Sequence, residues 1–215
     1  MNREELSARM SGASPDHGLL RGWARGLLLR AADGEPVPAV HHPLGFVCLP
    51  VERDGGAGVC LHVWSSRLPG AVPTTSSIHC HSWDLVSYVL FGEVGNRLPE
   101  VAAPEGRPTH RLFQVVSGPG GDELLPTDRT VRHGAGSAER FGAGAVYRLP
   151  AGMFHESVVG GAGDAATIAL GAERPGLPNL SLGPLGGAAH RVARRPCGGE
   201  ALRTVARGAL AGMGG

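Results

Sequence analysis

The sequence predicts an all-β fold in which antiparallel strands form a sandwich or barrel. Gly and Pro occupy 35 and 17 of the 215 positions, and so many turn-forming residues are typical of a chain that reverses direction often. Short runs of alternating apolar and polar residues, bounded by Gly or Pro, fill the middle of the chain. No helical periodicity lies between these runs, which excludes parallel βαβ folds because their strands need crossover helices.

The N-terminal segment, residues 1–35, is predicted to be a helical appendage in two pieces. The charged stretch at residues 1–10 forms the first piece, and a Gly/Ser/Pro break at residues 11–15 ends it. Apolar residues then recur near the spacing of one helical face. These residues are Leu19, Leu20, Trp23, Leu27 and Leu28.

Eight strands are predicted within residues 36–175, which we expect to form the β-barrel domain. The alternating runs cover residues 46–52, 58–65, 76–83, 85–94, 110–117, 145–150, 155–160 and 166–171. The turn-rich segments 95–109 and 118–126 are expected to be loops at the mouth of the barrel, where ligand selection usually occurs.

The C-terminal segment, residues 176–215, is predicted to be a Pro/Gly-rich tail with one short helix. Residues 177–199 show no pattern, whereas GEALRTVARGAL places Leu202, Val205 and Leu210 on one helical face. This helix either docks on the barrel or frays.

Composition excludes several classes of function. The 20 basic residues are all Arg and oppose 19 acidic residues, so the net charge of +1 creates no broad field for nucleic acid or an anionic membrane. The absence of Lys excludes Schiff-base chemistry on a lysine. Residues 26–29 are too short an apolar run for a signal peptide or a membrane span. With four cysteines that lack CxxC spacing, we expect a cytoplasmic protein with free thiols.

Two histidines one residue apart are the strongest chemical signal in the chain. His79 and His81 lie in the predicted strand 76–83, and alternate residues of a strand project from one face. Both imidazoles can therefore reach one metal ion. His155 opens a later predicted strand, after a Pro/Gly turn. Three imidazoles with open coordination positions are typical of a catalytic metal site.

The segments around these histidines resemble the two signature motifs of the cupin superfamily. The first reads HCHSWDLVSYVLFG from His79 to Gly92, and the second reads GAVYRLPAGMFH from Gly144 to His155, which matches G-x5-P-x-G-x2-H. The resemblance covers residues 40–172. It implies a cupin double-stranded β-helix, a jelly-roll barrel, in which His79, His81 and His155 bind a metal.

The first motif departs from the cupin pattern at the fourth ligand. Cupins with four ligands carry a Glu three or four residues after the second His, where this chain has Leu85 and Val86. The nearest carboxylate, Asp84, would point to the opposite face of a regular strand, although a bulge after Trp83 could turn it inward. The sequence leaves open a site of three His and a site of three His with Asp84.

Four arginines are candidates for binding an anionic substrate, because the guanidinium group binds carboxylates through two hydrogen bonds. Thiol dioxygenases of the cupin superfamily carry such an Arg on a strand ahead of the HxH motif, and Arg53 could be its counterpart. Arg97, Arg111 and Arg148 are the alternatives.

Aromatic residues near the motifs are candidates for the rest of the site. Tyr88 and Tyr147, the two tyrosines, could hold substrate by their hydroxyl groups as catalytic residues, or could pack in the core. Trp83 and Phe154 adjoin ligands and are expected to form an apolar wall against substrate. His62 is a candidate for contact with the ligands, Cys80 should point away from them, and five other histidines are expected to be solvated. Those five are His41, His42, His110, His133 and His190.

The resemblance implies a non-haem Fe(II) dioxygenase or oxygenase that acts on a small carboxylated or amino-acid-like substrate and O2, with a homodimer as the expected assembly. Imidazole sites also suit Ni, Mn, Cu and Zn, so these ions stay open. One alternative is a cupin isomerase, epimerase or lyase that uses the metal as a Lewis acid. The other is a non-catalytic, ligand-binding cupin.

Overall fold

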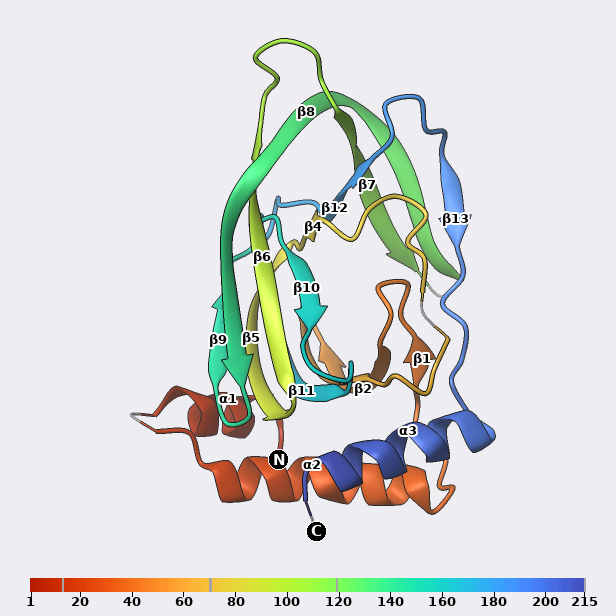
Figure 1. Ribbon diagram of the computed structural model, residues 1–215. Helices are drawn as coiled ribbons and strands as arrows, with labels where there is room; N and C mark the ends of the chain where they lie inside the picture. Colours follow the sequence, from red (N-terminus) through yellow and green to blue (C-terminus); the bar gives the residue numbers. More distant parts are fainter. Residues whose placement is uncertain (13, 70, 119, 215) are drawn as a thin grey trace.

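The computed structural model describes residues 1–12, 14–69, 71–118 and 120–214 (Figure 1). Ala13 and Pro119, which fall in the predicted helix break and in a predicted loop, lie outside the described residues, as do Gly70 and Gly215. The described chain forms two antiparallel sheets and three helices. The predicted all-β class, with helices at both ends of the chain, is confirmed.

The elements have the following bounds. The helices are α1 (Arg3–Ser11), α2 (His17–Ala32) and α3 (Gly199–Gly212). The strands are β1 (Val40–His41), β2 (Val47–Asp54), β3 (Ala57–Trp64), β4 (His79–Cys80), β5 (Trp83–Phe91), β6 (Glu93–Ala102), β7 (His110–Gly118), β8 (Gly121–Gly142), β9 (Val146–Leu149), β10 (Glu156–Val159), β11 (Ala165–Glu173), β12 (Leu180–Gly183) and β13 (His190–Val192). None of the described helices is long and apolar enough to cross a membrane.

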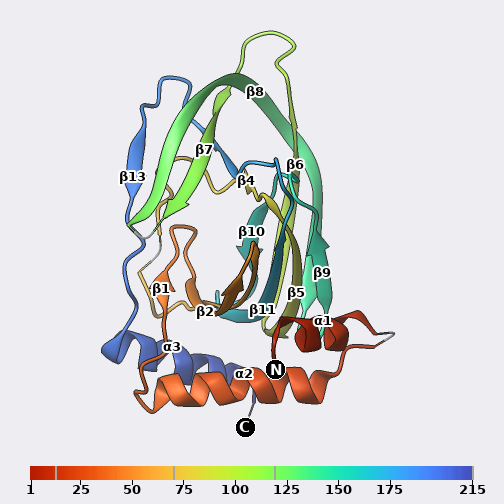
Figure 2. The same ribbon diagram turned by 180° about the vertical axis from the view of Figure 1, so that it is seen from behind.

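The helices cover the outer face of a six-stranded sheet of order β1-β2-β3-β11-β5-β9 (Figures 1 and 2). Asn2 and Glu5 form a capping box at the start of α1, and Asp16 caps α2 by accepting a hydrogen bond from the backbone of Leu19, so both predicted helical pieces are confirmed. The predicted C-terminal helix is α3, which docks beside α2. Leu20, Leu28, Leu202 and Val205 are buried between the helices and the sheet.

Both faces of the six-stranded sheet are buried, and the strand period of two residues divides the side chains between them. On β3, Leu61 and Val63 pack in the cluster beneath the helices, whereas His62 and Trp64 line a cavity between the two sheets. The same sheet therefore supports the helical layer and forms one wall of the barrel interior.

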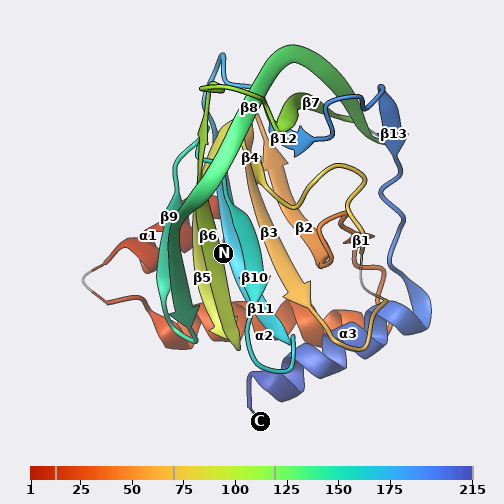
Figure 3. The same cartoon turned by 45° about the horizontal axis from the view of Figure 1, so that its top comes forward.

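The second sheet closes on itself. Its strands follow the order β10-β6-β8-β7-β12-β4, and a bridge between His79 and His155 joins β4 back to β10. Four neighbouring strands of the first sheet thus face four neighbouring strands of the second: β3, β11, β5 and β9 face β4, β10, β6 and β8. The chain crosses repeatedly from one sheet to the other, as it does in a jelly roll. Figure 3 shows the barrel with the helices below it.

Two segments predicted to be loops are largely strands. β6 spans Glu93–Ala102, so Gly92 separates two strands where one was predicted over 85–94. β8 spans Gly121–Gly142 and arches over the barrel (Figure 1), pairing with β7 through its first half and with β6 through its second. Most of its second half is exposed, so the sequence carries no apolar alternation there that could indicate a strand.

The tail predicted to be unpatterned contributes to the barrel. β12 lies between β7 and β4, and β13 pairs with β8. These strands have only four and three residues, which is too short for a period of two to become visible in the sequence.

Gly92 should be a position that no other residue can occupy without loss of stability. Its φ is +76°, and a Cβ atom there would lie 2.4 Å from the carbonyl oxygen of Asp164. Gly176 has a similar φ, +85°, but open space around it. We expect Gly92→Ala to lower the free energy of unfolding by about 3 kcal/mol and Gly176→Ala by about 1 kcal/mol, measured by urea denaturation. Equal losses would show that crowding at Gly92 is unimportant.

Candidate metal centre

A backbone bridge between His79 in β4 and His155, the residue before β10, places the three motif histidines together. His79 and His155 exchange two backbone hydrogen bonds, of 3.0 and 2.8 Å, and the amide of Gly152 donates to the carbonyl of His81 at 2.8 Å. The imidazole centroids are 4.7 Å apart for His79 and His81, 4.3 Å for His79 and His155, and 5.0 Å for His81 and His155. One ring nitrogen of each histidine lies within 4.8 Å of the other two.

In two of the imidazoles, a hydrogen bond at Nδ1 leaves Nε2 free to bind a metal. Nδ1 of His79 lies 2.8 Å from the carbonyl oxygen of Ser77, and Nδ1 of His155 lies 3.1 Å from that of Met153. Because a carbonyl oxygen only accepts, each Nδ1 must carry the proton, so in the neutral ring Nε2 keeps a lone pair. Metal-binding histidines commonly make this contact. The residues therefore fit a metal ion.

The three imidazoles are held in the neutral form. Burial, together with the neighbouring His155, lowers the pKa of His79 to about 3. Burial is also the main cause that lowers the pKa of His81 and of His155. Neutral rings keep their lone pairs at physiological pH, which metal coordination requires.

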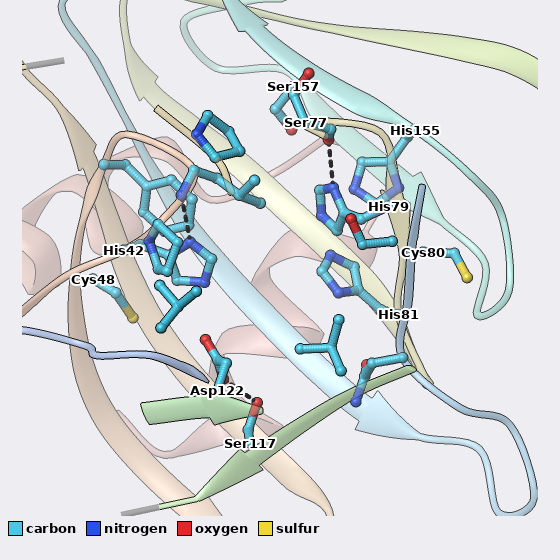
Figure 4. A pocket seen from close by; sticks show the side chains of 18 of the residues that line it. His42, Cys48, Ser77, His79, Cys80, His81, Ser117, Asp122, His155 and Ser157 are labelled. Carbon is cyan, nitrogen blue, oxygen red and sulfur yellow. Dashed lines mark hydrogen bonds between the residues drawn. The ribbon is translucent and has the colours of Figure 1, made fainter. Parts of the chain in front are cut away.

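The imidazoles line a cavity of about 230 Å³ between the two sheets (Figure 4). Aromatic side chains form much of its wall, among them Phe46, Trp64 and Trp83. Trp83 stacks on His81 with a centroid distance of 4.4 Å and an interplanar angle of 17°. Trp83 therefore lies where an apolar wall was expected.

Arg97 supports the site from outside the cavity. Its side chain is 63% exposed, and its guanidinium group pairs with Glu156 at 3.0 Å. Glu156 also accepts a hydrogen bond from the hydroxyl of Ser77. Ser77 in turn provides the carbonyl that orients His79. The structure thus places Arg97 in a chain of contacts that positions the site, and not among the residues that line the cavity as a substrate-binding group would.

Asp84 does not join the imidazoles. Its carboxylate accepts hydrogen bonds from the amide of Ala151 at 2.9 Å and from Nε of Arg174 at 2.6 Å. These two contacts, the Ala151 amide first, lower the pKa of Asp84. β5 pairs regularly with β11 through Asp84, opposite Ala172, so the bulge that could have turned the carboxylate inward is absent there. Of the two alternatives that the sequence left open, the geometry favours three histidines without Asp84.

The two tyrosines lie on opposite sides of the six-stranded sheet. Tyr147 lines the cavity and stacks on Phe141 at 4.8 Å. Tyr88 is fully buried on the helical side, where its hydroxyl lies 2.9 Å from Nδ1 of His17 in α2. The prediction that Tyr88 is a catalytic residue therefore conflicts with its position.

Of the remaining candidates, Arg53 and His62 line the cavity. Phe154 packs against the cluster that contains Cys80 and Leu112, and it was expected in the cavity wall. Arg111 lies on β7, where its backbone is opposite Gly183 of β12, and it is not among the residues that line the cavity. Its Nε has no hydrogen-bond partner among the described residues. Phe154 and Arg111 therefore lie outside the site, although the sequence placed them in it.

The sequence missed several residues that line the cavity. His42, expected to be solvated, stacks on Phe46 at 4.3 Å, and burial lowers its pKa. Asp122 and Arg194 form an ion pair at 2.8 Å. The hydroxyl of Ser117 donates a hydrogen bond to Asp122 and accepts one from Arg194. Cys48 and Cys60 come together with His62. The spacing of Cys60 and His62 in a predicted strand was a local signal that both share a face, whereas Cys48, His42 and the Asp122–Arg194 pair reach the cavity through contacts with distant parts of the chain that no local pattern indicates.

Comparisons with known proteins add little to this geometry. No family model and no curated protein matches the chain. Among solved structures, the polyketide cyclase RemF from Streptomyces resistomycificus is similar at a TM-score of 0.33 and 15% identity, over 70% of this chain and 75% of that one. Hydroquinone 1,2-dioxygenase PnpCD, in complex with Cd2+ and 4-hydroxybenzonitrile, is similar at 0.35 and 15%, over 73% and 77%. At this level of similarity, neither structure indicates an activity for this chain.

Asp84→Asn should leave metal binding intact. The substitution removes the charge that pairs with Arg174, so we expect the same metal content and affinity as in the wild type, measured by elemental analysis and competition with a chelator. Because the pKa of Asp84 is lowered in the folded state, its contribution to stability is present at neutral pH. It is lost as the pH falls below about 4, the ordinary range of Asp, and through that lowered pKa. Arg174→Ala is the matched control. A loss of affinity in Asp84→Asn but not in Arg174→Ala would identify Asp84 as a ligand.

Tyr88→Phe should affect stability and not the site. Removal of the hydroxyl breaks the hydrogen bond to His17 and should lower the free energy of unfolding by about 1 kcal/mol. A double-mutant cycle with His17→Ala, followed by urea denaturation, should give a coupling energy of similar size. Metal content should not change. A Tyr88→Phe variant of normal stability that loses metal or turnover would contradict this assignment.

Proposed function

We propose that the protein is a metal-dependent enzyme in which His79, His81 and His155 hold Fe(II), and that it acts as a dioxygenase on a small carboxylated substrate. The observation that supports this proposal most strongly is the pair of Nδ1–H contacts to backbone carbonyls, which orients two Nε2 lone pairs in a cavity. Both rings have the proton on Nδ1, which is the tautomer that metal-binding histidines usually adopt when their other ring nitrogen is the ligand.

Three protein ligands suit catalysis better than a structural role. They leave coordination positions for substrate and co-substrate, whereas structural sites are fully coordinated by the protein. Fe(II), when bound, would supply the one-electron chemistry with O2 that amino-acid side chains do not provide. The described surroundings offer no carboxylate to the cluster, so all the donors are neutral.

The side chains around the imidazoles would bind the substrate and exclude water. Arg53 is exposed and lines the cavity, and among the described residues its guanidinium group has no ion-pair partner within 4 Å. It is therefore available to a substrate carboxylate. Phe46, Trp64 and Trp83 surround the remaining volume with apolar surface, which limits the access of water.

His42 and Tyr147 would hold protons at the cavity wall. Nδ1 of His42 accepts a hydrogen bond from the amide of Leu44 at 3.3 Å, so in the neutral ring Nε2 carries the proton and can donate to a substrate oxygen. Burial raises the pKa of Tyr147, which keeps its hydroxyl protonated and able to donate. Both residues therefore favour a substrate with acceptor atoms.

Metal loading with oxygen uptake tests the proposal. Purified protein incubated anaerobically with Fe(II) should bind one ion per chain at the imidazoles, detected by the electron paramagnetic resonance signal of its nitric oxide adduct. His79→Ala should weaken this binding at least tenfold, since even the loss of a contact outside the ligand set commonly costs that much. His110→Ala, which removes a histidine on β7 outside the cavity lining, should bind Fe(II) normally.

Turnover separates the proposed reaction from its alternative. With small carboxylic acids and amino acids as trial substrates, the Fe(II)-loaded protein should consume O2 in step with product. Turnover without O2 would overturn the dioxygenase assignment in favour of Lewis-acid chemistry. Failure to bind any metal, or unchanged binding in His79→Ala, would overturn the site itself.

A further inference from the structure

A second cluster of metal-binding side chains lines the same cavity. Cys48 comes from β2, and Cys60 and His62 come from β3, within the six-stranded sheet. The three-histidine group belongs instead to the other sheet, with His79 in β4, His81 just after β4 and His155 just before β10, so the two clusters lie on different walls (Figure 4). The two sulfur atoms and one ring nitrogen of the second cluster lie within 4.8 Å of one another.

Strand register brings these side chains together. β2 and β3 are antiparallel, and Cys48 lies directly opposite His62. Cys60 is two residues from His62 on the same strand, so both project from the same face. The aromatic ring of Phe46 contacts His62 at a centroid distance of 4.5 Å and restricts its orientation. The cluster is therefore a consequence of the sheet and does not depend on flexible loops.

The positions of the two cysteines favour a metal over a disulfide. Because Cys48 faces His62, Cys60 is its diagonal neighbour, and diagonal cross-strand residues are about 7–8 Å apart between Cα atoms. Disulfides usually need Cα atoms about 4.4–6.8 Å apart. Two thiolates around a tetrahedral ion with metal–sulfur bonds of about 2.3 Å lie about 3.7 Å apart, which small side-chain rotations can reach here.

The donor atoms of the second cluster are accessible from the cavity, because Cys48, Cys60 and His62 are all among the residues that line it. The thiolate, and not the thiol, is the form of cysteine that binds a metal. A bound cation would therefore displace the thiol protons and release them to solvent.

We propose that Cys48, Cys60 and His62 form a second metal site, for a thiophilic d10 cation, Zn(II) or Cu(I). Two thiolates and an imidazole are soft to borderline donors, which reject Mg2+ and Ca2+ and differ from the all-nitrogen set of the three histidines. Three protein ligands leave one tetrahedral position open towards the cavity. The cavity thus holds two sites of different metal preference, and this inference does not depend on the reaction proposed above.

Co(II) titration of the full-length, reduced protein tests the site. The titration uses the His79→Ala variant, because this substitution weakens metal binding at the three histidines. Co(II) substitutes for Zn(II) and shows thiolate-to-metal charge-transfer absorption when bound by Cys. We expect this absorption to saturate at one Co(II) per chain and to disappear on addition of Zn(II). Cys60→Ser should abolish it and weaken Zn(II) binding at least tenfold. Cys197→Ser, which changes a buried thiol in the cluster beneath the helices, is the matched control and should behave as the parent.

A parallel titration with Cu(I), against a Cu(I) chelator under argon, decides which of the two ions binds more tightly. A third measurement keeps the proposal testable if Cys60→Ser does not fold. Zn(II) or Cu(I) should protect Cys48 and Cys60, but not Cys197, from alkylation as read by mass spectrometry.

Absence of both the charge-transfer absorption and Cu(I) binding, or persistence of the absorption in Cys60→Ser, would overturn the site, as would alkylation of Cys48 and Cys60 that neither Zn(II) nor Cu(I) slows. None of these results would affect Fe(II) binding by the three histidines, which is read from the nitric oxide adduct.

Discussion

The two backbone hydrogen bonds between His79 and His155 are the constraint on which the rest of the structure depends. They join β4 to β10 and so close the second sheet. They also place an imidazole from each signature motif on neighbouring strands, and His81 follows because it is two residues from His79. The carbonyls two residues before His79 and before His155 then select the same tautomer in both rings. The same two hydrogen bonds therefore close the barrel and bring the imidazoles together.

The strand period of two residues decides which side chains face the cavity and which face the helices. Leu61 supports the helical layer, while its neighbours Cys60 and His62 turn inward. Tyr88 and Tyr147 lie on adjacent strands of one sheet and end on opposite faces. Because α2 and α3 bury the outer face, the sheet tolerates polar, reactive groups on its inner face without losing its hydrophobic support.

Arginine neutralises the carboxylates around the barrel. Glu156 pairs with Arg97, Asp84 with Arg174, and Asp122 with Arg194. Each pairing occupies a carboxylate that could otherwise have approached the cluster, and a buried carboxylate without such a partner would be costly. Among the described residues that line the cavity, the two groups that could hold a metal consist of imidazoles and thiols, and they are the donors of the two metal sites proposed above.

The sequence by itself determined the fold class, the terminal helices and the three histidines, because these depend on local periodicity and on spacing within short motifs. Turn residues and the alternation of a strand act over a few positions, and His79 and His81 share a face in any regular strand. Only the tertiary structure decided the strand character of β8 and β12, the burial of His42 and the meeting of Cys48 with Cys60 and His62. It also decided that Asp84 pairs with Arg174, 90 residues away, and does not join the imidazoles. The physical reason is that cross-strand register and the choice of ion-pair partner join segments far apart in the chain, and no local pattern records which segments will meet.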